Sequence, residues 1–146
     1  MPGSDPAPDL APAALAFARM LRARHAELLA PHGLHPGQDA LLMALWREGG
    51  QSQVDLAAHL GVEPPTITRM AQRLERGGLI DRRPDPDDAR AVRLFVTPRA
   101  RLLEAVVRRV WSELDAMIAE AVGVTEAARL GRTLDAVVRS WSVRGE

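Results

Sequence analysis

The polar residues between Thr66 and Arg73 are the part of this chain best suited to recognise another molecule. In the run PPTITRMAQRLER, four apolar residues recur at spacings of three and four, which predicts an amphipathic helix with one buried face. The residues left on the outward face are Thr66, Thr68, Arg69, Gln72, Arg73 and Arg76. Arginine and glutamine can each form paired hydrogen bonds with one base, and threonine can contact a phosphate or the thymine methyl group. This face is therefore expected to read the DNA major groove.

A second group of charged residues lies between two predicted strands, residues 79–83 and 91–96. The segment between them, PDPDDAR, has the proline and aspartate content of a turn. An arginine at the tip of such a hairpin is attracted by the negative potential of the minor groove, so Arg90 is expected to reach it. Asp88 is interpreted as a partner that orients a nearby arginine. An ion pair within the loop that touches no DNA remains an alternative.

Short helices must position these groups. Ser52 and Asp55 resemble a capping box, which predicts a helix from there to residue 59 or 60, and Gly61 supplies a tight turn. The next helix opens at Pro64, where a missing amide is harmless, and ends at Gly77. Helix, turn, helix and hairpin together predict a winged helix-turn-helix. The residues expected near the DNA phosphates are Ser52, Gln53 and Pro65.

The stretch 34–97 resembles the MarR family of winged-helix regulators. The resemblance rests on the run DLAAHLGVEPPTITRMAQRLERGGLIDR, on the Asp-x-Arg pattern at Asp88 and Arg90, and on Thr97 before a long helix. The chain departs from the family pattern at Glu63, Val96 and Ala100. The resemblance implies a homodimer, a palindromic operator and usually a small-molecule effector.

Long helices are predicted on both sides of this region. Helices are expected over residues 9–30 and 34–50, and two more follow the capping pair Thr97-Pro98, over 98–122 and from 125 to about 144. Their apolar stripes are too extensive for one small domain to cover, so they should pack against a second copy. The predicted fold is mainly α. Its parts are a flexible tail (1–8), an N-terminal dimerisation helix (9–33), a winged helix-turn-helix DNA-binding domain with a small β-hairpin wing (34–97) and C-terminal dimerisation helices (98–146).

Composition narrows the function further. The 146 residues include 19 basic and 19 acidic ones, so the net charge is zero and any DNA-binding surface must be a local arrangement of arginines. The absence of cysteine excludes disulfides and thiolate metal sites. No apolar run is long enough to span a membrane and no signal-peptide pattern is present, so the protein is expected in the cytoplasm. Histidine spacing predicts no metal site, and the lack of phosphate-loop or nucleophile motifs predicts neither a cofactor nor an enzyme.

These observations predict a dimeric, sequence-specific DNA-binding transcriptional regulator. A repressor is favoured because occupying a promoter needs no additional contact surface. The family resemblance adds release by a small ligand, for which an aromatic anion would suit Arg24, His25, Met43 and Trp46. That these four are only core or surface residues stays open. The alternative function is a winged-helix protein-interaction module that binds no DNA.

Overall fold

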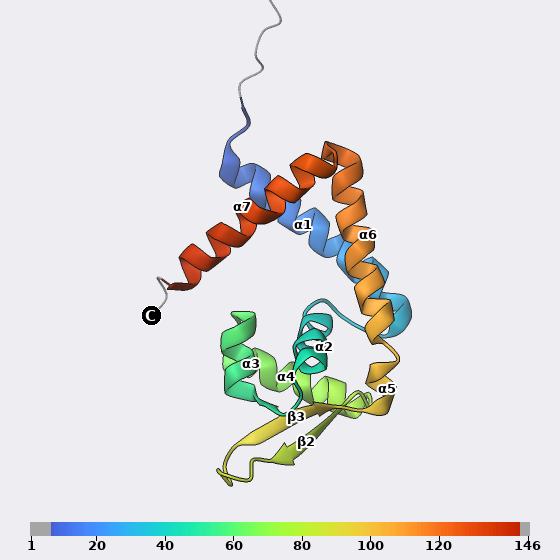
Figure 1. Cartoon of the computed structure of the whole chain (residues 1–146), viewed down its shortest axis with the longest axis vertical. Coiled ribbons are helices and arrows are strands. Elements are labelled where there is room, and N and C mark those ends of the chain that lie inside the picture. The colour runs from blue at the N-terminus through green and yellow to red at the C-terminus, as the bar shows by residue number, and fades with distance from the viewer. Residues whose placement is uncertain (1–6, 144–146) are drawn as a thin grey trace, which may run out of the picture.

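The computed structural model describes residues 7–143 and is built mainly from helices (Figure 1). In chain order its elements are α1 (Leu10–Leu29), η1 (Ala30–His32), α2 (Gln38–Arg47), β1 (Gln51–Ser52), α3 (Gln53–Leu60), α4 (Pro64–Arg76), β2 (Ile80–Pro84), β3 (Val92–Val96), α5 (Pro98–Arg101), α6 (Glu104–Val122) and α7 (Val124–Val143). The elements from α2 to β3 form a compact winged lobe, whereas α1, α6 and α7 extend away from it (Figure 1). The predicted class, mainly α with a small β-hairpin wing, is confirmed. Most of the predicted tail, residues 1–6, lies outside the described residues.

The core of the winged lobe comes from the apolar stripes that the sequence displays. Leucines 41, 42 and 45 of α2 and Leu56 of α3 are fully or almost fully buried. From α4 the same core receives Ile67, Ala71 and Leu74, at the predicted helical spacing. The inward face of α4 is therefore fixed by packing, and its opposite face is turned to solvent.

The wing is an antiparallel hairpin of β2 and β3 in a sheet of order β1-β3-β2. The short strand β1 was not predicted. Its two residues pair with β3, and the Gly50 amide donates to the Leu94 carbonyl at 2.9 Å. A two-residue strand carries no alternation of apolar residues, so this pairing has no sequence signal.

The predicted bounds of two helices are wrong. The second helix ends at Arg47 rather than at residue 50. The second helix begins at Gln38 rather than at residue 34, because Gly37 turns with φ 99° and Asp39 accepts its amide at 3.0 Å. The long helix expected from residue 98 is interrupted after Arg101, where the amides of residues 102 and 103 bond three residues back. Its predicted start is confirmed, because the Thr97 hydroxyl accepts the Ala100 amide at 3.2 Å.

The helices α1, α6 and α7 leave many large apolar side chains exposed. They include Met20, Met117, Val122, Val124, Leu134, Val138 and Trp141. Within residues 7–143, none of the helices has both the length and the apolar character that crossing a membrane requires. The helices α1, α6 and α7 therefore carry an exposed apolar surface outside the winged lobe.

Candidate nucleic-acid interface

The outward face of α4 carries the long polar side chains that the sequence singles out. The helix opens with Pro64 and Pro65, whose missing amides cost no hydrogen bond in a first turn. Thr66, Arg69, Gln72, Arg73 and Arg76 are exposed, as is Pro65. Among residues 7–143, no ion pair involves Arg69 or Arg73. Both guanidinium groups are available to a ligand outside the protein.

Thr68 does not lie with this group, which corrects its predicted outward position. Its side chain is partly buried, and its hydroxyl lies 3.1 Å from Oε1 of Gln53 and 3.2 Å from the Pro64 carbonyl oxygen. Thr68 follows Ile67 directly, so it projects from the side of α4 that meets α3. Thr68 and Gln53 therefore form one pair at the contact between the two helices, at the edge of the exposed face.

Ser52 serves first as the cap of α3. Its hydroxyl oxygen accepts the Asp55 amide at 3.0 Å, as the capping pattern predicts. A hydroxyl that accepts one hydrogen bond can still donate another. Ser52 can therefore cap α3 and donate to a phosphate at the same time.

In the wing, Asp88 orients the backbone of Arg90 rather than its guanidinium group. The Asp88 Oδ1 atom accepts the Arg90 amide at 2.9 Å, and no ion pair joins the two side chains within residues 7–143. Arg90 is exposed. The alternative of an ion pair between Asp88 and Arg90 is therefore not found among the described residues, and the Arg90 side chain projects from the wing into solvent.

A short ion pair of the wing instead joins Asp85 to Arg93, with Nε 2.6 Å from Oδ2. Arg93 also donates to the Gly50 carbonyl at 3.1 Å, which connects the wing to the chain after α2. The Asp87 amide and the Arg93 side chain hold the pKa of Asp85 below its ordinary value. Sequence reasoning missed this pair. The register places Arg83 opposite Arg93, and Asp85 supplies a compensating charge beside these two like charges.

The four residues predicted to bind a small ligand occupy different surroundings. Arg24 pairs with Glu27 and lines an apolar hollow of about 660 Å³ between α1 and α6. Trp46 lines a separate hollow of about 240 Å³ beside Phe95 and Arg101, and its Nε1 is buried without a hydrogen-bond partner among residues 7–143. Met43 packs against the core of the winged lobe. Arg24 and Trp46 thus face two distinct cavities.

His25, the fourth of these residues, contacts a residue that sequence reasoning missed. Its Nε2 lies 2.7 Å from Oδ2 of Asp39, which is fully buried at the start of α2. The same oxygen accepts the indole N–H of Trp111 on α6 at 2.7 Å. No motif marks Asp39. The only available signal was an acidic residue in the first turn of a helix.

Comparison with known proteins agrees with this architecture. Residues 34–92 match the model of the MarR family. The HTH-type transcriptional regulator TtmR of Methylorubrum extorquens strain PA1 is 37% identical over 92 residues, which are 63% of this chain and 45% of TtmR. The chain spans about half the length of the curated relatives that it matches.

Solved structures extend the likeness to the flanking helices. The crystal structure of MarR is 26% identical with a TM-score of 0.76, over 93% of this chain and 99% of that one. The transcriptional repressor CouR, solved bound to a 23-mer DNA duplex, is 24% identical with a TM-score of 0.83, over 89% of this chain and 92% of CouR. The matched stretch contains α2, α3, α4 and β2, and the fold agrees with that of MarR over almost the whole chain, so residues 34–92 are a winged-helix region of the MarR family.

Proposed function

We propose that this protein is a sequence-specific DNA-binding transcriptional regulator that acts as a homodimer on a palindromic operator. The observation that carries the proposal is the exposed face of α4, on which Arg69, Gln72 and Arg73 stand free beside an exposed wing. Arginine pairs with guanine and glutamine with adenine in the major groove, and Thr66 adds a contact to a phosphate or a thymine methyl group. The α4 helix is the element that would enter this groove.

The surrounding residues would set the register of the protein on the duplex. Ser52 and Pro65 lie at the starts of α3 and α4, where backbone and side-chain groups can contact phosphates. The Thr68–Gln53 pair stands beside them. Arg90 extends from the wing toward the adjacent minor groove, and Asp88 holds its backbone in the turn.

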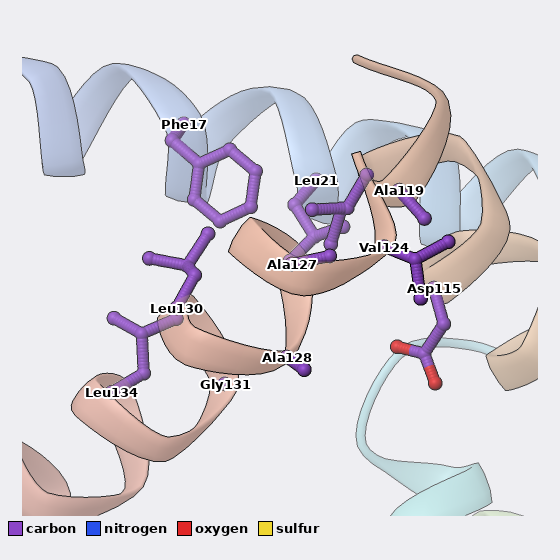
Figure 2. Close-up of a pocket in the computed structure, with 11 residues that line it drawn as sticks. Phe17, Leu21, Asp115, Ala119, Val124, Ala127, Ala128, Leu130, Gly131 and Leu134 are labelled. Carbon is purple, nitrogen blue, oxygen red and sulfur yellow. The ribbon is translucent and has the colours of Figure 1, made fainter. Parts of the chain in front are cut away.

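A second copy is the partner that fits the exposed apolar surface of α1, α6 and α7. Two hollows between these helices, of about 550 and 660 Å³, are lined mainly by apolar residues. In the smaller one, Phe17 points from α1 toward Leu130 of α7 (Figure 2). Apolar surface of this extent stabilises a homodimer when it is removed from water. Two copies of α4 related by a twofold axis would bind half-sites about 34 to 36 Å apart.

A repressor released by a small anion completes the proposal. Occupying a promoter requires no surface beyond the DNA-binding face. The hollow beside Trp46 is lined by the aromatic side chains of Trp46 and Phe95 and by the cation Arg101, with Glu104 at the same hollow. Aromatic rings beside a cation suit a small aromatic carboxylate. Operator affinity measured with and without aromatic carboxylates tests this part, and equal affinities across the series would remove it.

DNA binding is tested by titrating a labelled duplex from the region upstream of the protein's own gene against a shuffled duplex of equal length. Specific operators are typically bound about a thousandfold or more tighter than other DNA. We expect that preference here, with an affinity that falls steeply as salt rises. Equal binding of both duplexes would contradict sequence-specific reading, and no binding to either would favour a protein-interaction module.

A further inference from the structure

Asp39 is a buried carboxylate between the winged lobe and the helices proposed to form the dimer. Its side chain is fully buried. Oδ2 lies within hydrogen-bond distance, 2.7 Å, of Nε2 of His25 on α1, and it accepts the indole N–H of Trp111 on α6, also at 2.7 Å. Oδ1 accepts the Gly37 amide at 3.0 Å. One carboxylate therefore connects α1, α6 and the start of α2.

Core packing alone does not account for a carboxylate at this position. A buried ion pair or charge network is often no more stabilising than apolar residues of the same volume, because the charge must leave water. Here the Gly37 amide, the Trp111 indole and the His25 imidazole give the two carboxyl oxygens three hydrogen-bond partners. Hydrogen bonds depend on angle, whereas apolar contacts do not. The carboxylate can therefore fix the orientation of α1 and α6 relative to the start of α2, which an apolar side chain could not do.

The contacts of Asp39 continue to α4. Gly37, whose amide Asp39 accepts, has φ 99°, and a Cβ atom added there would lie 3.2 Å from Sδ of Met70. Met70 lies on α4, between the exposed Arg69 and the buried Ala71. The Gly37 turn therefore lies close against the helix proposed to read DNA, with no room for a side chain between them.

We propose that Asp39 is a positioning residue for operator binding. Its hydrogen bonds set the orientation of the winged lobe relative to α1 and α6, and thereby the separation of the two α4 helices in the homodimer. This inference rests on the proposed function, since a separation matters only for a dimer that binds two half-sites. The carboxylate touches no DNA and acts through the helices that it connects.

The test compares operator duplexes whose half-site centres are moved apart or together by one base pair. The wild-type protein should prefer one spacing. Asp39→Asn keeps the volume of the side chain but replaces one accepting oxygen with a donor, so at least one of the three hydrogen bonds is lost. We expect affinity for the preferred spacing to fall about 2- to 30-fold, the range over which mutations distant from a ligand alter coupling, and the preference over the other spacings to shrink. Trp111→Phe, which removes one bond, should change both quantities in the same direction but less.

Leu41→Val provides the matched control, because it weakens the core of the winged lobe without touching the carboxylate. All variants are compared at a temperature where each is fully folded. If Asp39→Asn retains the wild-type ratio of affinities across the spacings, as Leu41→Val should, the inference is overturned. If Asp39→Asn does not fold, an unchanged ratio in Trp111→Phe overturns it instead. A wild-type protein that prefers no duplex would contradict the proposed function and with it this inference, whereas an unchanged ratio in the variants overturns this inference alone.

Discussion

At the level of single residues, the exposed arginines of α4 are available for binding because no acidic side chain among residues 7–143 forms an ion pair with Arg69, Arg73 or Arg76. Arg76 and Arg69 differ in this respect from Arg82, whose guanidinium group lies 3.7 Å from Glu75, and from Arg93, which is held by Asp85. An arginine with no partner loses no ion pair when it binds a base or a phosphate. Because the net charge of the chain is zero, attraction to DNA depends on unpaired arginines at the binding surface rather than on the charge of the whole molecule.

Arg73→Ala should weaken binding of the preferred duplex by about 1 to 3 kcal/mol and relax the sequence preference if Arg73 pairs with a base. If Arg73 contacts a phosphate instead, affinity should fall uniformly across sequences and the salt dependence should decrease. Fluorescence anisotropy at several salt concentrations distinguishes the two. Arg132→Ala removes the same charge from exposed α7 and should leave both quantities unchanged. Unaltered binding by Arg73→Ala would exclude Arg73 from the interface.

Asp85→Asn should alter the pH dependence of stability. Because the Asp87 amide and Arg93 depress the pKa of Asp85 in the folded state, its contribution is present above the ordinary value of 3.8 and is lost as pH falls through the folded pKa. The variant should therefore be less stable than wild type at neutral pH, and the difference should disappear at a pH well below 3.8. Urea unfolding at both pH values measures this. Asp87→Asn removes an equal charge outside the ion pair, so a similar result for both variants would contradict the explanation.

Sequence alone identified the exposed and buried faces but not the partners of individual residues. Helical spacing predicts that Ile67 is buried and Arg73 exposed, because periodicity depends only on neighbours along the chain. The Trp111–Asp39 hydrogen bond joins residues 72 positions apart, and no local pattern predicts such a contact. The partly buried position of Thr68 was likewise not predicted from the sequence, because it depends on where α3 packs against α4.

At the level of elements, prolines and glycines marked the bounds that the sequence predicted well. Pro64 begins α4, where its fixed φ suits a first helical turn. After Gly77 the chain turns at Gly78, whose φ of 69° favours glycine. The break between α5 and α6 has no such residue. It arises where the chain leaves the sheet and turns onto α1, so tertiary packing determines it.

Thr97 joins the end of the α4 region to the start of α5. Its hydroxyl donates to the Gly78 carbonyl at 2.7 Å and accepts the Ala100 amide at 3.2 Å. Thr97→Val keeps the shape and removes both bonds, so the free energy of unfolding should fall by about 1 to 3 kcal/mol. Thr97→Ser retains the hydroxyl and should recover most of this loss. Urea denaturation checks both, and equal losses for Val and Ser would show that the hydroxyl is unimportant.

At the level of the whole molecule, the winged lobe has its own core, whereas the helices beyond it do not. The fully buried side chains come almost entirely from the lobe and from the adjoining parts of α1 and α6. On α7 every residue from 131 to 142 is exposed. A helix with an apolar stripe and no buried residue is a poor element of a monomer, because packing supplies most helical stability.

Leu134→Asp should convert the proposed dimer into monomers. Leu134 lines the hollow that Phe17 enters, and a carboxylate there would lose its water on association without gaining a partner (Figure 2). The winged lobe should remain folded, because no residue of its core is changed. Each monomer would then bind a single half-site, and loss of the linked second contact should weaken operator binding by about 100- to 10,000-fold.

Ala136→Asp adds the same charge on the other side of α7, where the apolar stripe does not run, and should leave both mass and affinity near wild type. Sedimentation velocity and operator titration on the two variants separate assembly from folding. A Leu134→Asp protein that still sediments as a dimer would place the interface elsewhere on the molecule. One that becomes monomeric yet binds the operator at full affinity would mean that each winged lobe recognises DNA alone, since no second α4 would then be needed to explain its affinity.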